Sequence, residues 1–131
     1  MQCTSQVLMI RPIRFGYNAE TAVNNYFQQT VDHSVQEKAL EEFEALVSKL
    51  RSNKIIVNVV EDSIDPHTPD SIFPNNWISF HEDNRITLYP MFAENRRKER
   101  KETVLQSIRT HFNIAQINDL SYYEKADKFL E

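Results

Sequence analysis

The chain has 131 residues and a formal net charge of −4, with 19 acidic against 15 basic residues. This length suits one domain, and an acidic chain lacks the basic surface that nucleic-acid binding requires. No apolar run approaches the roughly 20 residues of a membrane-spanning helix, and the first residues lack the features of a secretory signal. The single cysteine, Cys3, excludes an internal disulfide and is typical of a reducing compartment. We therefore expect a cytoplasmic protein without nucleic-acid or membrane partners.

The amino-terminal half predicts a strand, a helix and a second strand. Residues 6–11 contain four consecutive apolar residues and end at Pro12, which is typical of a short buried strand. Residues 13–33 lack periodicity and predict a loop with room for one helical turn. Residues 34–50 begin with the spacing of a capping box and continue with apolar residues at helical intervals. Residues 55–60 are β-branched except for one Asn and predict a strand.

The second half predicts a hairpin, a helix and a final strand. After a proline-rich turn, residues 77–80 and 85–91 read as two strands joined by a turn at 81–84. Apolar residues at helical spacing indicate a helix over about 97–112, and residues 113–117 predict a short strand. This order of elements favours an α/β fold, and no linker divides it into domains.

The most informative segment is the punctuated block that follows the second strand. It reads Asp65-Pro66-His67-Thr68-Pro69 and then Asp70-Ser71-Ile72-Phe73-Pro74-Asn75-Asn76-Trp77. Prolines next to Asp and Asn mark rigid turns, and α/β proteins commonly place their chemistry at strand ends. His67 and His81 lack Cys or His partners at zinc-ligand spacing, so we expect no metal site. Trp77 is interpreted as a core residue with a hydrogen-bonded N–H.

Four segments of the chain resemble the guanidine-modifying superfamily, also called the pentein or amidinotransferase/deiminase fold. The segments are Leu8 to Pro12, Thr21 to Asn25, Asp70 to His81, and Leu88 to Met91 with Asn95 to Arg100. They are most similar to bacterial hydrolases proposed to act in citrulline utilisation. The resemblance implies a partial α/β propeller, in which this chain forms about two of five ββαβ-type modules.

The family members are more than twice as long, and their nucleophilic Cys and general-acid His have no counterpart in residues 1–131. We therefore expect the chain to be a single-domain, amino-terminal fragment of a longer pentein-fold enzyme that is inactive alone. Cys3 matches nothing in the family's catalytic motif and is not expected to be the nucleophile. The resemblance implies no cofactor.

In the superfamily, a thiolate attacks the central carbon of a guanidinium or ureido group, and a His protonates the leaving group. The covalent adduct divides one difficult substitution into two easier steps. Carboxylates hold the nitrogens of the substrate, a small ureido or guanidino amino acid. The resemblance implies roles for several residues here: Asp70 matches the acid that begins the motif, Phe73 a position beside the substrate, Arg96 and Arg97 a pair that contacts its carboxylate, and Glu131 a catalytic carboxylate.

Asn76 stands where deiminase relatives usually carry a guanidinium-binding Asp. A carboxylate only accepts hydrogen bonds, whereas an amide both accepts and donates them. A neutral ureido group presents a carbonyl acceptor beside N–H donors, and Asn76 matches that pattern. The substitution therefore predicts a preference for a ureido substrate, such as citrulline, over arginine. The structural alternative is an Asx turn after Pro74.

Structural alternatives also stand beside the other roles. Phe73 suits the core equally well, and Glu131 suits a frayed terminal residue. Five cations in residues 96–101 oppose the dipole of the predicted helix, which favours a functional reason for them. For three of them, a solvated helix face is at least as good an explanation: Lys98, Arg100 and Lys101.

Two functions are compatible with these patterns. The first is the amino-terminal part of a hydrolase acting on the ureido or guanidino group of citrulline- or arginine-like substrates. The second is a non-catalytic binding module. Two modules cannot close a ring, so exposed strand edges would then be covered by self-association in a homo-oligomer.

Overall fold

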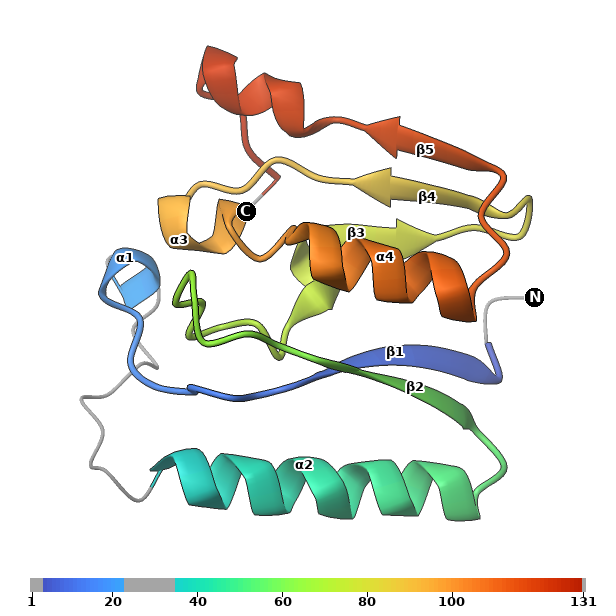
Figure 1. The fold of residues 1–131 in the computed structure, drawn as a ribbon. Coiled ribbons are helices and arrows are strands. Elements are labelled where there is room, and N and C mark those ends of the chain that lie inside the picture. Colours follow the sequence, from blue (N-terminus) through green and yellow to red (C-terminus); the bar gives the residue numbers. More distant parts are fainter. Residues whose placement is uncertain (1–3, 23–34, 131) are drawn as a thin grey trace.

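Two small β-sheets, each with a connecting helix, form the computed structural model, which describes residues 4–22 and 35–130 (Figure 1). In the first sheet, β1 (Gln6–Arg11) runs parallel to β2 (Ile56–Glu61), with Gln6 opposite Ile56 and Arg11 opposite Glu61. A parallel pair needs a long crossover connection, which α2 (Val35–Ser52) provides. The predicted strands and helix in this half are confirmed to within two residues.

Helix α2 covers one face of the first sheet (Figure 1). Phe43 and Val47 of the helix form a buried cluster with Val57 of β2. The predicted apolar face is only partly used, because Leu40 and Leu46 are exposed. Ser34, the predicted cap of this helix, lies outside the described residues.

The second sheet has the order β3-β4-β5. Strand β3 (Ile78–Phe80) pairs antiparallel with β4 (Arg85–Leu88), and β4 pairs parallel with β5 (Gln116–Asp119). Helix α4 (Glu102–His111) is the crossover between the two parallel strands. This second unit therefore repeats the strand–helix–strand plan of β1, α2 and β2, with one additional antiparallel strand. The described part of the chain is a mixed α/β domain.

The main core lies between the two sheets, where α4 packs against both. It includes residues from β1, β2, β3, β4, α4 and the segments next to β3 and β4: Ile10, Val60, Trp77, Ile78, Ile86, Leu88, Met91, Val104 and Ile108. Trp77 is 1% exposed, which confirms its core position. The predicted hydrogen bond of its indole is wrong for the described residues, because Nε1 has no partner there.

The predicted helix over 97–112 is wrong at its beginning. A separate turn, α3 (Glu94–Arg97), is capped by Lys98. Helix α4 starts only at Glu102, because Lys101 has an extended backbone with ψ of 142°. The predicted strand at 113–117 is displaced to β5, whose register is set by pairing with β4. Three shorter elements complete the fold: α1 (Ala19–Ala22), η1 (Pro74–Asn76) and η2 (Ser121–Ala126). No helix among the described residues is long and apolar enough to cross a membrane.

Candidate functional site

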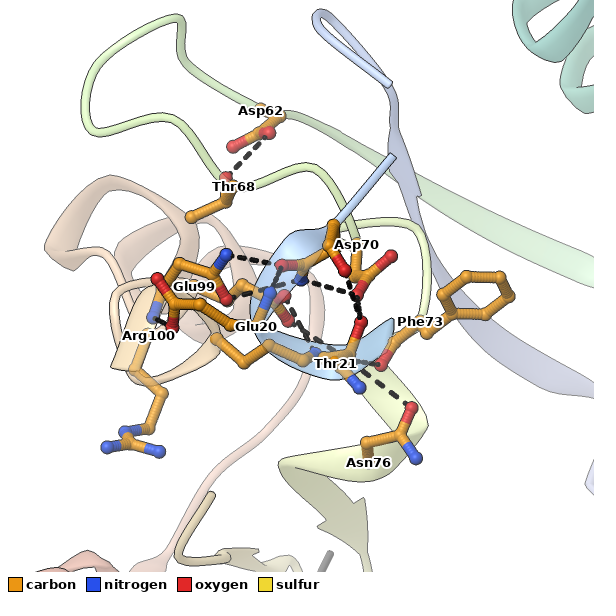
Figure 2. A network of polar contacts seen from close by, with 12 residues as sticks. Glu20, Thr21, Asp62, Thr68, Asp70, Phe73, Asn76, Glu99 and Arg100 are labelled. Atoms are coloured by element: carbon orange, nitrogen blue, oxygen red, sulfur yellow. Dashed lines mark hydrogen bonds and ion pairs between the residues drawn. The ribbon is translucent and has the colours of Figure 1, made fainter. Parts of the chain in front are cut away.

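A network of buried polar side chains joins α1, the segment 62–76 and α3 (Figure 2). Residues 62–76 follow the carboxyl end of β2, so the network lies where the predicted chemistry of an α/β fold is expected. The segment contains a cis peptide bond between Asp65 and Pro66. Buried polar groups are expected to have partners, and most of these do.

Asn18, which is 1% exposed, is the centre of the first part of this network. Its Nδ2 donates to Asp70 Oδ2 at 2.7 Å, and its Oδ1 accepts from Asn95 Nδ2 at 2.6 Å. The Thr21 hydroxyl also donates to Asp70 Oδ2, at 3.2 Å. The backbone N–H of Asn95 donates to Glu20 Oε2 at 2.9 Å. These bonds hold α1 and α3 against the segment that contains Asp70.

Arg96, which is 4% exposed, is the centre of the second part. Its Nε lies 3.0 Å from Glu99 Oε1, and its Nη2 lies 3.3 Å from Glu99 Oε2. The same Nη2 donates to Phe73 O at 3.1 Å and to Asn76 Oδ1 at 3.3 Å. Arg96 thus connects α3 with η1 and with the residue that precedes η1.

Glu99 carries an unusual carboxyl group in this site. Burial raises its pKa from the ordinary 4.5 to about 7, against the opposing effect of the Arg96 guanidinium. The nearby carboxylates of Asp70 and Asp62 make smaller contributions to this raised pKa. Glu99 is therefore a group that can change charge near neutral pH.

A third buried cluster closes the network on the side of α4. Lys101 Nζ lies 2.6 Å from Asp62 Oδ1 and 3.0 Å from both Thr68 Oγ1 and Ser63 O. The Thr68 hydroxyl donates in turn to Asp62 Oδ2 at 3.1 Å. These contacts tie the loop after β2 to the beginning of α4.

The predicted site residues fall into two groups. Asp70, Phe73, Asn76 and Arg96 are brought together by the network described above. Arg97 lies apart from them: it donates to the carbonyls of Met91 at 2.8 Å and Phe92 at 2.9 Å. Glu131 and Cys3 lie outside the described residues, so the predictions for them stay predictions.

Several structural alternatives from the sequence are wrong. Phe73 is 45% exposed and is not a core residue. Asn76 Oδ1 accepts from Arg96, instead of from the backbone as in an Asx turn. Arg100 and Lys101 do not lie on a solvated face: Arg100 Nη2 is 2.7 Å from Glu124 Oε1, and both cations are largely buried. Only Lys98 is exposed as that alternative requires.

The two histidines of the block contact a backbone carbonyl and side-chain hydroxyls. His67 Nε2 lies 3.1 Å from the Arg14 carbonyl, and His81 Nε2 lies 3.0 Å from Ser79 Oγ and 3.1 Å from Thr87 Oγ1. Among residues 4–22 and 35–130, no group of three or more His, Cys, Asp or Glu side chains could hold a metal ion.

Sequence reasoning missed Asn18, Asn95 and Glu99. Glu99 had a usable signal, because a carboxylate three residues after Arg96 is at pairing distance on a helical turn. Asn18 had none, since its partner Asp70 is 52 residues away.

Two comparisons relate this chain and its fold to known proteins. A family model described as N,N-dimethylarginine dimethylhydrolase, eukaryotic, matches residues 11–131. The crystal structure of ArgZ, an arginine dihydrolase from the ornithine–ammonia cycle in cyanobacteria, matches with a TM-score of 0.68 and 19% sequence identity. That match covers 88% of this chain and 16% of the ArgZ chain. No curated protein shows a significant sequence match.

These findings confirm the guanidine-modifying superfamily that the sequence resemblance indicated. More narrowly, the chain belongs to the N,N-dimethylarginine dimethylhydrolase family, whose model spans nearly all of it. The narrower resemblance to citrulline-utilisation hydrolases stays a prediction, as does the propeller arrangement of modules. The chain spans 16% of the length of ArgZ.

Proposed function

We propose that this chain is the amino-terminal part of a hydrolase that acts on the ureido or guanidino group of a citrulline- or arginine-like amino acid. Its substrate cradle consists of Asn76, Phe73 and Arg96, and the nucleophilic Cys and general-acid His come from outside these 131 residues. Family membership supports this class of reaction. Three of the residues that the resemblance assigned to the substrate, Phe73, Asn76 and Arg96, also lie together around η1 and α3.

The observation that carries the proposal is the orientation of the Asn76 amide. Its oxygen accepts from Arg96, which leaves the amide nitrogen as the group that can face a ligand. An amide N–H suits the carbonyl oxygen of a ureido group, whereas a guanidinium offers only N–H donors. Asn76 therefore favours citrulline over arginine.

The neighbouring residues have distinct proposed roles. Half-exposed Phe73 provides an apolar wall beside the substrate. Arg96 is 4% exposed, and its Nε and Nη2 already bind Glu99, Phe73 O and Asn76 Oδ1, so it supports the cradle from within instead of contacting the substrate's carboxylate. Asp70 acts indirectly, because its Oδ2 accepts from Asn18 and Thr21 and so holds α1 against the site. Arg97 is not part of the proposed cradle, because its guanidinium binds the backbone carbonyls of residues 91 and 92.

Ligand titration of the wild type and of Asn76→Asp tests the substrate preference. We expect the wild type to bind L-citrulline more tightly than L-arginine, and Asn76→Asp to shift that ratio toward arginine, because a carboxylate accepts from guanidinium. Asn75→Asp adds the same charge at an adjacent exposed position and is the matched control. An unchanged ratio in Asn76→Asp would contradict the proposed preference. Release of ornithine and ammonia from citrulline by the purified 131-residue chain would contradict the dependence on residues outside it.

The second candidate function is a non-catalytic module that self-associates. The unpaired edge of β1 favours it. The second unit pairs β3 antiparallel with β4, but no described strand occupies the corresponding edge of β1. An open groove of about 830 Å³ lies between β1 and the β3–β4 hairpin. An unpaired strand edge beside apolar surface favours pairing with another chain. Sedimentation over a range of concentrations tests it: this candidate predicts dimers, and a strict monomer contradicts it.

A further inference from the structure

The buried pair of Glu99 and Arg96 has no role in the function proposed above beyond the support that Arg96 gives to the cradle. Both side chains are at most 4% exposed, and they make two contacts, at 3.0 and 3.3 Å. Taking two charges out of water is costly, so a buried ion pair is weak evidence for stability. Such a pair is better explained by the geometry that it imposes on its neighbours.

Arg96 transmits that geometry to the substrate cradle. Its Nη2 donates both to Phe73 O at 3.1 Å and to Asn76 Oδ1 at 3.3 Å. A guanidinium has donors and no acceptor, so only the oxygen of the Asn76 amide can face it. The amide nitrogen must therefore point away from Arg96. Figure 2 shows Asn76 in this orientation, with its oxygen on the dashed line and its nitrogen on the opposite side.

We propose that Glu99 is a positioning residue: it holds the Arg96 guanidinium against Phe73 O and Asn76 Oδ1, so that Asn76 presents its NH2 group to the substrate. Without this anchor, the guanidinium can leave the Phe73 carbonyl, and the Asn76 amide can turn its oxygen outward. An outward oxygen would accept hydrogen bonds from a guanidinium. Glu99 therefore influences the relative affinity for ureido and guanidino substrates. This part of the inference rests on the proposed function, whereas the orientation of the amide does not.

The raised pKa of Glu99 is consistent with this geometry. Its carboxyl faces Arg96 from α3 and the carboxylates of Asp62 and Asp70 from the loop after β2, with Lys101 beyond Asp62. Of these groups, Arg96 is the one that contacts Asn76. A change in the charge of Glu99 therefore reaches the cradle through Arg96.

The test compares Glu99→Gln with Glu94→Gln in the 131-residue chain. Both variants remove one negative charge near α3, but Glu94 is exposed and outside the network. The first readout is the NMR signal pair of the Asn76 side-chain NH2 group, assigned by its loss in Asn76→Asp. The second readout is the ratio of dissociation constants for L-citrulline and L-arginine.

In Glu99→Gln we expect the Asn76 signals to shift or broaden, and citrulline binding to weaken about tenfold, the usual scale for a lost charged hydrogen bond. Arginine binding should weaken less, because the outward oxygen compensates. Glu94→Gln should match the wild type in both readouts. A reduced melting temperature with unchanged Asn76 signals would reveal a merely structural role and overturn the proposal.

The two proposals can fail separately. If the wild type binds neither amino acid, the proposed function fails, while the Asn76 signals still decide whether Glu99 positions the amide. If Glu99→Gln does not fold, Glu99→Asp keeps the charge and withdraws the carboxylate by one methylene. Unchanged Asn76 signals in Glu99→Asp would then overturn the positioning role, and displaced signals would support it.

Discussion

Arg96 and Asn76 are 20 residues apart in the sequence, yet Arg96 Nη2 lies 3.3 Å from Asn76 Oδ1. This bond connects the basic segment after β4 with the proline-containing turn before β3. It links the residue expected at the substrate's carboxylate with the residue expected at its ureido group. Because Arg96 is buried and also paired with Glu99, changes on either side of this bond should affect both stability and binding.

Removing the guanidinium should be more harmful than removing the whole ion pair. Arg96→Met leaves Glu99 buried without its partner, and loss of one member of a buried pair costs about 3–5 kcal/mol of unfolding free energy. The double variant Arg96→Met/Glu99→Leu removes both charges and should recover a large part of that loss. Urea denaturation of the single and double variants measures the difference. Equal destabilisation in both would contradict an electrostatic role for the pair.

The free energy of unfolding should decrease with rising pH because of Glu99. Its pKa is about 7 in the folded protein and near the ordinary 4.5 when unfolded, so the folded state binds more protons between these values. The stabilisation from protonated Glu99 is complete below about pH 4.5 and is lost as the pH rises through 7. Urea denaturation at pH 5 and pH 8 should show the wild type losing up to roughly 3 kcal/mol relative to Glu99→Gln. The same pH dependence in both proteins would contradict the assignment to Glu99.

Two lysines of the basic segment should differ in their importance. Lys101→Met leaves the Asp62 carboxylate, 2.6 Å from Nζ, buried without its cation, and should cost about 3 kcal/mol. Lys98→Met changes an exposed side chain and should alter stability by less than about 0.5 kcal/mol. Thermal unfolding of the two variants measures both effects. Similar melting temperatures would mean that the Lys101–Asp62 contact contributes little.

Asn18 should tolerate loss of its amide better than conversion to an acid. Asn18→Ala removes hydrogen bonds to Asp70 and Asn95 and should cost about 1–3 kcal/mol. Asn18→Asp places a second carboxylate against Asp70 Oδ2, where the amide nitrogen now lies at 2.7 Å, and should be worse at pH 7. Exposed Asn113→Asp is the control, and a smaller cost for Asn18→Asp than for Asn18→Ala would refute this account.

Local sequence patterns were sufficient for most elements of the fold. The apolar run of residues 6–11 and the helical periodicity after Ser34 are short-range signals, and both led to the observed β1 and α2. Prolines and asparagines likewise indicated that residues 65–77 form a turn that could carry functional side chains. The core position of Trp77 was predicted from its large aromatic side chain.

Long-range pairing was what the patterns could not show. Apolar spacing predicted one helix over 97–112, but Arg96, Arg100 and Lys101 bind partners in different parts of the chain. Those contacts favour an extended residue between α3 and α4. The helical spacing of apolar residues does not reveal them. Asn18 was missed for the same reason, because its role depends on side chains 52 and 77 residues away.

The segment from Arg96 to Lys101 fastens three separate stretches of backbone to one short connection. Arg96 reaches the turn at 73–76, Arg100 reaches Glu124 in η2, and Lys101 reaches the loop at 62–68. The spacing of these anchors is therefore as constrained as their identities. A one-residue insertion or deletion between Arg96 and Arg100 would shift Arg96 relative to both other anchors, whereas each substitution removes only one contact. The length of this connection should be the least variable property of the molecule.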